Sequence, residues 1–556
     1  TDGGGTAESK ASSATGAVSD IPIINLSTLD GTNGFRLDGV AAGDNSSYQV
    51  SSAGDINGDG YDDLIIGARY ADNNGSNSGS SYVVFGTGNA FASKVNLSTL
   101  DGTIGFRLDG VAVEDFSGTT VSSAGDINGD GYDDLIIGAY GADPNGGFSG
   151  SSYVVFGSGN AFASTVNLST LNGTTGFRLD GEAVLDESGY SVSSAGDVNG
   201  DGYDDLIIGA NYADPNGSAS GSSYVVFGKA GAFASTVNLS TLDGTNGFRL
   251  DGVAAGDQSG ITVSSAGDIN GDGYDDLIIG APFADNNGDD SGSNYVVFGS
   301  GNAFASTVNL STLNGTNGFR LDGEAGSDLS GYPVSSAGDI NGDGYDDLII
   351  GAGYADINGT NSGSIYVVFG SASAFASTVK LSTLDGTNGF RLDGEAASDV
   401  SGISVSSAGD VNGDGYDDLI IGAAYADING SSSGSSYVVF GSGNAFASTV
   451  DLSTLDGTNG FRLDGVATDD QSGFSVSSAG DINGDGYDDL IIGALDADFN
   501  GDQSGSSYVV YGGAKWGASA QAGTVGDDTV TGTAIADSLI GGEGNDTLSG
   551  LADNDI

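Results

Sequence analysis

The sequence predicts an all-β fold: a seven-bladed β-propeller with four-stranded blades, followed by a short β-roll-like segment. The stretch DINGDGYDDLIIGA, with Ile replaced by Val at its second position in the copies at 197 and 410, occurs seven times at a spacing of 71 residues, beginning at positions 55, 126, 197, 268, 339, 410 and 481. Each 71-residue repeat contains four short strand-like runs, and residues 523–556 carry a nine-residue repeat instead. A fixed period of this length is typical of propellers and related repeat architectures.

The four predicted strands can be placed in chain order. GFRLDG, first at 34–39, alternates apolar and charged residues and indicates a strand with one solvated face. YQVSSAG and DDLIIGA flank the repeated acidic loop and predict two more strands. SSYVVFG at 80–86 is β-branched and aromatic, which favours a strand buried on both faces. Residues 1–20 are small and polar, so we expect a flexible N-terminal segment, with the propeller at 21–512.

The strand order predicts how the ring closes. GFRLDG comes first in the repeat and SSYVVYG, at 506–512, comes last. We expect each GFRLDG to be the outermost strand of the preceding blade, so that the copy at 34–39 completes the seventh blade and removes two open sheet edges. The arginines of these strands are expected to pair with neighbouring carboxylates, with ligand binding as the alternative. They are Arg36, Arg107, Arg178, Arg249, Arg320, Arg391 and Arg462.

The acidic loop of each repeat predicts a cation site. Oxygen donors occur at loop positions one, three, five, seven and nine, where position seven contributes a backbone carbonyl. Gly60 at position six permits the positive φ of a sharp turn. Hard oxygen ligands around such a turn favour Ca²⁺ over Mg²⁺, which requires a tighter octahedral geometry. The alternative is an acidic hairpin without an ion, in which the crowded carboxylates repel one another.

These donor positions recur in all seven copies. The predicted ligands are Asp55, Asn57, Asp59, Tyr61, Asp63, Asp126, Asn128, Asp130, Tyr132, Asp134, Asp197, Asn199, Asp201, Tyr203, Asp205, Asp268, Asn270, Asp272, Tyr274, Asp276, Asp339, Asn341, Asp343, Tyr345, Asp347, Asp410, Asn412, Asp414, Tyr416, Asp418, Asp481, Asn483, Asp485, Tyr487 and Asp489. Position twelve is an isoleucine, Ile66 in the first copy, where an EF-hand places its bidentate Glu. The loop is therefore expected to join two strands rather than two helices.

Composition excludes several classes of function. The 556 residues include 75 acidic and 13 basic side chains, and the net charge of −62 excludes nucleic acid and disfavours anionic membranes as partners. The absence of Cys excludes a disulfide framework, and the absence of both His and Cys excludes Ser–His and Cys–His catalysis and His-ligated zinc. The sequence contains no run of 18 apolar residues, so no membrane-spanning helix is predicted.

The segment after the propeller has a different composition. Residues 513–522 are predicted to be a linker, and Trp516 within it is expected to pack against the propeller. Nine-residue units begin at Gly523, Gly532, Gly541 and Gly550, and their sixth positions place Asp528, Asp537 and Asp546 as further candidate calcium ligands. These units resemble the calcium β-roll of RTX proteins, in which glycine turns bind Ca²⁺. This resemblance implies secretion without an N-terminal signal peptide, and we expect the natural chain to continue beyond Ile556.

The order G-Y-x-V-S-S-A-G-D, D-x-N-G-D-G-x-x-D, L-I-I-G-A and G-S-x-Y-V-V-F-G resembles the FG-GAP repeat of integrin α-subunit propellers and their bacterial relatives. The resemblance covers about residues 21–512, although the name-giving G-A-P occurs only at 280–282. It implies that the acidic loop joins the innermost and second strands on the lower face of the disc and that the donor positions named above bind Ca²⁺. It also implies extracellular adhesion or recognition.

Two loops vary between the copies: the link after GFRLDG and the link after IIGA. In an up-and-down blade both emerge on the face opposite the acidic loops. They are either solvent-exposed loops under neutral drift or a binding surface, since loops often carry recognition. Asp44 and Asp72, which recur in every copy of these loops, are candidates to hold further cations.

The sequence therefore predicts a non-enzymatic, extracellular or cell-surface calcium-binding module that serves adhesion or structure. We expect low cytosolic Ca²⁺ to leave the acidic loops repelling one another and extracellular calcium to order them. Expected partners are an extracellular protein, matrix, glycan or a second copy of the chain, with no nucleic acid and no membrane insertion. The alternative is a lectin-like propeller that binds glycans between its blades. A hydrolase is disfavoured because no acidic pair stands apart from the repeated loops.

Overall fold

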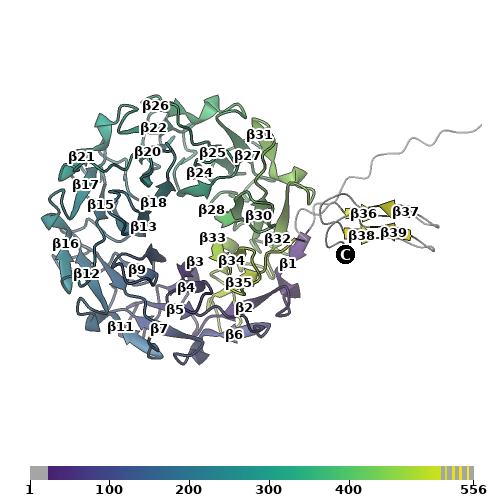
Figure 1. Ribbon diagram of the computed structural model, residues 1–556, viewed down its shortest axis with the longest axis horizontal. Helices are drawn as coiled ribbons and strands as arrows, with labels where there is room; N and C mark the ends of the chain where they lie inside the picture. The colour runs from purple at the N-terminus through teal and green to yellow at the C-terminus, as the bar shows by residue number, and fades with distance from the viewer. Residues whose placement is uncertain (1–22, 515–519, 523–528, 532–537, 541–546, 550–556) are drawn as a thin grey trace, which may run out of the picture.

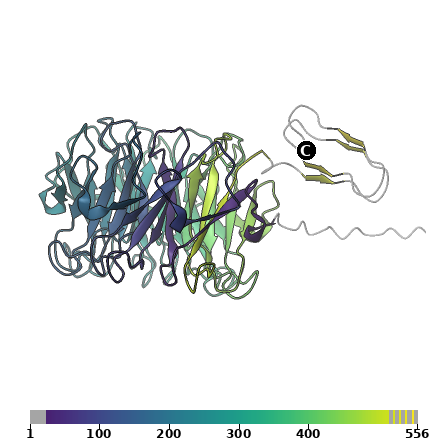
Figure 2. The same cartoon turned by 90° about the horizontal axis from the view of Figure 1, so that it is seen from below.

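The computed structural model describes residues 23–514 and four short strands at 520–522, 529–531, 538–540 and 547–549. Residues 23–514 form a closed ring of seven β-sheets (Figure 1), which is a disc when seen edge-on (Figure 2). Within this described part, the only helical segments are seven three-residue 3₁₀ turns. The predicted seven-bladed propeller is confirmed. The N-terminal segment predicted to be flexible lies outside the described residues.

Each sheet takes one strand from each of five classes. The innermost strands are β3 (Ser46–Gly54), β8 (Val121–Gly125), β13 (Ser191–Gly196), β18 (Thr262–Gly267), β23 (Val334–Gly338), β28 (Ser404–Gly409) and β33 (Ser472–Gly480). The second strands are β4 (Asp63–Ala68), β9 (Asp134–Ala139), β14 (Asp205–Ala210), β19 (Asp276–Ala281), β24 (Asp347–Ala352), β29 (Asp418–Ala423) and β34 (Asp489–Ala494). The third strands are β5 (Ser80–Val84), β10 (Ser151–Val155), β15 (Ser222–Val226), β20 (Ser293–Val297), β25 (Ser364–Val368), β30 (Ser435–Val439) and β35 (Ser506–Val510).

The outer part of each sheet consists of two further classes. The fourth strands, GFRLD, are β2 (Gly34–Asp38), β7 (Gly105–Asp109), β12 (Gly176–Asp180), β17 (Gly247–Asp251), β22 (Gly318–Asp322), β27 (Gly389–Asp393) and β32 (Gly460–Asp464). The fifth strands are β1 (Ile23–Asn25), β6 (Lys94–Asn96), β11 (Thr165–Asn167), β16 (Thr236–Asn238), β21 (Thr307–Asn309), β26 (Thr378–Lys380) and β31 (Thr449–Asp451). Each fifth strand runs directly into a 3₁₀ turn: η1 (Leu26–Thr28), η2 (Leu97–Thr99), η3 (Leu168–Thr170), η4 (Leu239–Thr241), η5 (Leu310–Thr312), η6 (Leu381–Thr383) or η7 (Leu452–Thr454).

The fifth strand adds to the predicted blade. The four antiparallel strands follow the predicted order, but β11 then pairs in parallel with β7, with Thr165 opposite Arg107. GFRLDG is therefore not the outermost strand of the sheet. Because β11 belongs to the third repeat, the first sheet contains strands from three successive repeats.

The N-terminal residues close the ring on two blades. β2 pairs antiparallel with β35, with Phe35 opposite Val509, and so completes the seventh blade as predicted. β1 pairs in parallel with β32, with Ile24 opposite Leu463, and so becomes the fifth strand of the sixth blade. The two pairings cover strand edges that would otherwise be open.

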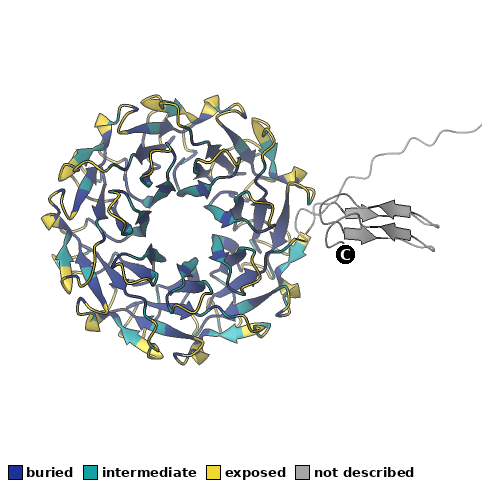
Figure 3. Cartoon of the chain, viewed as in Figure 1, coloured by how far each residue is buried: buried dark blue, intermediate teal, exposed yellow. Residues whose placement is uncertain are grey.

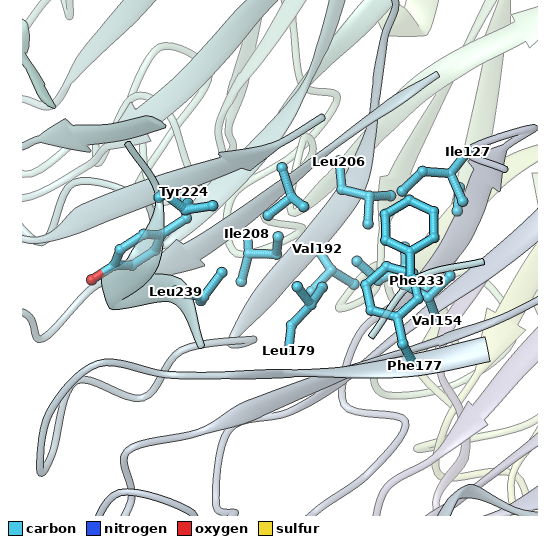
Figure 4. Close-up of a cluster of buried hydrophobic side chains, with 14 of the residues drawn as sticks. Ile127, Val154, Phe177, Leu179, Val192, Leu206, Ile208, Tyr224, Phe233 and Leu239 are labelled. Atoms are coloured by element: carbon cyan, nitrogen blue, oxygen red, sulfur yellow. The ribbon is translucent and has the colours of Figure 1, made fainter. Parts of the chain in front are cut away.

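The hydrophobic core lies between neighbouring blades. Figure 4 shows one such cluster, in which Val154 and Phe177 of the second blade pack against Leu206 and Ile208 of the third. Phe233, from the loop after the third strand of the third blade, stacks on Phe177 with ring centroids 4.4 Å apart. Figure 3 shows that the sheets are mostly buried and that the exposed residues lie on the loops and at the outer rim, where each fifth strand begins with an exposed residue. Because apolar side chains of one blade need the next blade for burial, each blade is stabilised by its neighbours.

The strands after the propeller pair two nine-residue units apart. β36 (Ala520–Ala522) pairs in parallel with β38 (Ser538–Ile540), and β37 (Thr529–Thr531) with β39 (Thr547–Ser549). Strands that pair at this spacing are what the predicted β-roll requires. The candidate ligands Asp528, Asp537 and Asp546, and Trp516 in the predicted linker, lie outside the described residues.

Candidate calcium loops and the opposite face

The seven acidic loops lie at one end of the inner strands. In the first blade, residues 55–62 join β3 to β4, the innermost and second strands, as expected. Gly58 and Gly60 have φ values of +74° and +89°, a conformation that favours glycine. Because the inner strands of all blades run in the same direction around the axis, the seven loops share one face of the disc.

Asp55 organises the turn of its loop. One of its carboxylate oxygens accepts hydrogen bonds from the backbone N–H groups of Gly58 (2.7 Å) and Asp59 (3.0 Å), and the other accepts one from Gly60 (2.9 Å). A carboxylate has about four lone-pair sites, so these three bonds leave one free for a further contact. The turn thus holds the Asp55 carboxylate in place, and the carboxylate keeps the capacity to bind a cation.

Asp63 is the buried acid of the site. Its side chain is fully buried and accepts hydrogen bonds from the Gly86 N–H (2.8 Å) and from Asn57 Nδ2 (3.3 Å). Burial, followed by repulsion from Asp59 and Asp55, raises the pKa of Asp63 to about 8. A half-turn of the Asn57 amide places its oxygen where the nitrogen lies. A buried carboxylate beside two other acids lacks a counter-charge, and a cation would supply it.

The other six loops have the same electrostatics. Burial is again the first cause that raises the pKa of the ninth-position acid, to about 8 for Asp134, Asp205, Asp276, Asp347 and Asp489 and to about 9 for Asp418. In each loop the third-position asparagine donates its amide N–H to this acid. The seven loops are therefore equivalent candidate sites.

The predicted ligands lie near one another, but their side chains are not arranged around a single point. In the described residues, no three acidic side chains converge on one point. Asp59 accepts the backbone N–H of Tyr61 at 3.2 Å and remains exposed at the edge of the loop. The donor set is all oxygen once the asparagine amide turns, which fits Ca²⁺. The assignment of these positions as ligands stays a prediction.

The acid at the eighth position of each loop, Asp62 in the first copy, has a structural role that its sequence position does not indicate. Asp133, in the loop of the second blade, accepts the backbone N–H of Asp55 in the loop of the first blade at 2.8 Å. The ring of Tyr132 lies against Gly58 of the same neighbouring loop, where a Cβ atom would overlap it. Each candidate site is thus in contact with the next one around the disc.

The arginines of GFRLD pair with carboxylates, as predicted. Arg107 forms a two-bond pair with Asp109, with Nε–Oδ1 at 2.6 Å and Nη2–Oδ2 at 3.0 Å. In three blades the arginine also contacts a glutamate from the preceding link. These pairs are Arg249–Glu182, Arg391–Glu324 and Arg462–Glu395, at 3.0–3.1 Å.

The two variable loops do emerge together on the opposite face. The N–H of Glu114 donates to the carbonyl of Ser76 at 2.9 Å, which joins the link after GFRLDG to the link after IIGA of the preceding blade. Asp44 accepts the Ala41 N–H and Asp72 accepts the Asn77 N–H, so both cap turns. Burial, and then repulsion by Asp72, raises the pKa of Asp44. A further cation at these acids stays a prediction.

Comparison with known proteins agrees with this architecture. The FG-GAP repeat family matches residues 47–84, 117–155, 188–226, 259–297, 332–368, 401–439 and 472–510, and the RTX calcium-binding nonapeptide repeat (4 copies) matches residues 522–556. No helix in the described residues has the length and apolar character needed to cross a membrane.

Similar proteins include integrin alpha chains. Integrin alpha-6 of Gallus gallus is 31% identical over 176 residues, which is 31% of this chain and 14% of that protein. Integrin alpha-6 of Homo sapiens is 32% identical over 167 residues, 29% of this chain and 13% of the relative. Integrin alpha-PS2 of Drosophila melanogaster is 27% identical over 310 residues, 55% of this chain and 20% of the relative. The chain thus spans a fifth or less of the length of these relatives. It belongs to the FG-GAP repeat proteins, as a seven-bladed propeller followed by RTX calcium-binding nonapeptide repeats.

Proposed function

We propose that this chain is an extracellular, non-enzymatic adhesion or structural module whose propeller is held in its functional state by seven Ca²⁺ ions. The observation that carries the proposal is the buried acid Asp63 and its six counterparts. Each lies beside two further acids of its loop, and burial raises its pKa to about 8 or 9. A bound cation removes this electrostatic cost, so calcium binding favours the folded ring.

The first, third, fifth, seventh and ninth positions of each loop would hold the ion. In the first loop these are Asp55, Asn57, Asp59, the carbonyl of Tyr61 and Asp63. Ca²⁺ supplies positive charge and a fixed coordination shell, while the chain supplies the turn that orients the oxygens. Since each loop contacts the preceding one through its eighth-position acid, ordering one loop also supports its neighbour.

Adhesion is supported by the unequal distribution of exposed apolar side chains. Among the described residues, nine of the eleven large exposed hydrophobic side chains lie on the variable loops, opposite the calcium loops. They are Val113, Val184, Leu185, Tyr212, Tyr354, Ile357, Tyr425, Ile428 and Phe499. Exposed apolar side chains that share one face can contribute to a partner-binding surface there. The integrin alpha relatives support the same reading, with an extracellular protein or matrix component as the partner.

The calcium part of the proposal is tested by melting the full chain. We expect the thermal midpoint to fall strongly in EDTA and to recover with Ca²⁺ but not with equimolar Mg²⁺. Isothermal titration should detect seven propeller sites in addition to those of the nonapeptide repeats. Equal melting temperatures with Ca²⁺ and with EDTA would show that ion binding does not support the fold.

The adhesion part needs a separate measurement. Beads coated with the full chain should bind extracellular matrix or cells in Ca²⁺ and lose binding in EDTA. The test variant is the full chain with Leu185→Ser and Ile357→Ser, which removes exposed apolar groups from the loop face. It leaves all seven acidic loops intact. If this variant adheres as well as the parent chain, the loop face is not the adhesive surface.

A further inference from the structure

The central channel of the propeller contains a cavity of about 410 Å³. On the loop face its mouth is surrounded by six aromatic rings, here named the aromatic collar. The collar consists of Tyr48, Tyr190, Tyr332, Phe474, Tyr354 and Tyr425. Tyr354 and Tyr425 are 36% and 37% exposed, so solvent reaches the collar from the loop face.

The collar breaks the sevenfold repetition of the chain. One position at the start of the innermost strands is occupied in turn by Tyr48, Thr119, Tyr190, Ile261, Tyr332, Ile403 and Phe474. Two positions further along each strand, Val followed by Ser lines the channel in every blade. Aromatic rings thus alternate with smaller side chains around the mouth, except where the seventh and first blades meet. There Phe474 packs against Tyr48 with ring centroids 5.4 Å apart.

The cavity is uncharged in a strongly acidic chain. Although the protein carries a net charge of −62, none of the described residues that line this cavity is charged. Below the collar its walls carry hydroxyl and amide groups from Gln49, Thr120, Thr262 and the serines of all seven blades. A site with aromatic rings at its mouth and neutral hydrogen-bonding groups on its walls suits a neutral polar ligand with apolar faces.

Arg69 argues against a cationic ligand. It is the only arginine outside the seven GFRLD strands, and its guanidinium lies 3.5 Å from the ring centroid of Tyr48 and 4.5 Å from that of Tyr70. The faces of aromatic rings attract cations, and here a cation of the chain itself already occupies the face of one collar ring. A second cation in the collar would be repelled by Arg69 at short range.

We propose that the aromatic collar binds one neutral sugar residue per chain, such as the end of an uncharged glycan. The apolar face of a sugar ring stacks on the exposed rings, and its hydroxyl groups reach the hydroxyl and amide groups of the channel wall. The cavity volume lies within the range of about 300–1,000 Å³ that is usual for small-ligand sites. This inference rests on the proposed recognition role of the loop face and names its ligand and position, at the channel mouth rather than between the blades.

The ligand class is tested with the full chain in Ca²⁺. Methyl glycosides of glucose, galactose, mannose and fucose are titrated by calorimetry and by saturation-transfer NMR, with glucuronate and choline as the anionic and cationic comparators. We expect one of the neutral glycosides to bind with a stoichiometry of one and at least about tenfold more tightly than either comparator. Preferential binding of choline or glucuronate, a stoichiometry near seven, or no binding of any neutral glycoside would each overturn the proposal.

The site is tested with substitutions that the chain itself tolerates. Tyr190→Thr and Tyr332→Thr introduce the residue that stands at the equivalent position of the second blade, Thr119. Each is expected to weaken binding by about tenfold, because an aromatic anchor is lost. Ile261→Thr, at the same strand position, is the matched control and should bind as the parent chain does.

Two further outcomes separate this proposal from the calcium function. All three variants should keep the parent calcium stoichiometry and a cooperative melting transition in Ca²⁺, which checks folding independently of sugar binding. If Tyr190→Thr and Ile261→Thr bind sugar equally well, the collar is not the site. A chain that needs calcium to fold but binds no sugar would refute the collar proposal alone.

Discussion

The carboxylate of Asp62 accepts a hydrogen bond at 2.9 Å from the backbone N–H of Asp481, a residue 419 positions away in the chain. This bond joins the loop of the first blade to that of the seventh. Six equivalent bonds of 2.7–2.8 Å join the other neighbouring loops, the first of them between Asp133 and Asp55. The seven bonds form a closed circle on the calcium-loop face, so that the start of every candidate site is fixed by the next blade.

Removal of the acceptor in this circle should destabilise the ring. Asp62→Ala leaves the Asp481 N–H without its partner, and we expect a loss of about 1–3 kcal/mol in the free energy of unfolding. Asp62→Asn keeps an acceptor oxygen and removes a charge, so it should lose much less. Denaturant unfolding in saturating Ca²⁺ measures the difference. Asp133→Ala, within the circle but away from the closure, is the matched control. It should lower the free energy of unfolding by about the same amount as Asp62→Ala. If the alanine and asparagine variants of Asp62 are equally stable, the hydrogen bond does not contribute.

The closure of the ring should depend far more on β2 than on β1. Of the residues that the structure describes, deletion of residues 1–25 removes only the three-residue fifth strand of the sixth blade, and we expect a small decrease in melting temperature. Deletion of residues 1–38 also removes the fourth strand of the seventh blade and exposes the edge of β35. An exposed strand edge promotes association. Size-exclusion chromatography should therefore show oligomers or aggregates only for the longer deletion, and monomers from both would contradict the closure described here.

The interblade glutamates should stabilise their blades. The hydroxyl of Tyr366 donates to Glu324 at 3.1 Å, and Arg391 donates to the same carboxylate oxygen at 3.0 Å. The equivalent Tyr295 has a buried hydroxyl group without a hydrogen-bond partner, and a valine, Val253, stands in place of the glutamate.

Exchanging these side chains in both directions tests their contribution. Glu324→Val should lower the free energy of unfolding by about 1–3 kcal/mol, because a buried hydroxyl group loses its acceptor. Val253→Glu should raise it by about 0.5–1.5 kcal/mol, because it provides an acceptor for Tyr295 and a partner for Arg320. Chemical denaturation of both variants in Ca²⁺ gives the two values. A destabilised Val253→Glu variant would show that the cost of burying the added charge exceeds the gain.

The loop-face acid Asp115 should make stability depend on pH. Burial, and then repulsion from Asp143, raises its pKa to about 6, above the value of about 3.9 for an unfolded Asp. The folded state therefore holds the proton more tightly, and the stabilisation present below about pH 4 is lost as the pH rises through about 6. Asp115→Asn keeps an acceptor for the Ala112 N–H, which donates to Asp115 at 2.8 Å. In Ca²⁺, Asp115→Asn should raise the melting temperature near neutral pH and leave the melting temperature unchanged near pH 4.

Asp101 provides a control of opposite sign. A hydrogen bond from the Thr103 side chain lowers its pKa, so its charged form stabilises the fold above about pH 4 and this contribution is lost on acidification. Asp101→Asn should therefore lower the melting temperature slightly near neutral pH, and the chain already carries Asn172 at the equivalent position. If both asparagine variants shift stability in the same direction, the two pKa shifts do not govern the pH dependence.

Much of the architecture follows from local sequence patterns. The runs GFRLDG, DDLIIGA and SSYVVFG predicted strands that the structure contains, and their order predicted that residues 34–38 complete the seventh blade. The pairing of Arg36 with Asp38 was also predictable, because alternate residues of a strand lie on the same face.

The remaining features depend on contacts between distant repeats. The fifth strand has only three residues and pairs with a strand of the preceding repeat, so no periodicity indicates it. The role of Asp62 was missed because its partner, Asp481, lies in another blade, and a carboxylate within a predicted ligand loop suggests metal binding first. The collar position was visible as a variable residue, from Tyr48 to Phe474, shortly before the Val-Ser pair that all seven strands share, but only the closed ring brings these residues around one cavity.

The offset between repeat and blade has a consequence for how such a chain changes over generations. Each 71-residue unit contributes three strands to one sheet and one strand to each of the two sheets before it. A gene that gains or loses one whole unit by recombination between its near-identical copies would therefore leave no sheet incomplete. Connectivity accepts any number of units, and the count of seven is instead set by the angle at which neighbouring blades pack and by whether the first and last units then meet.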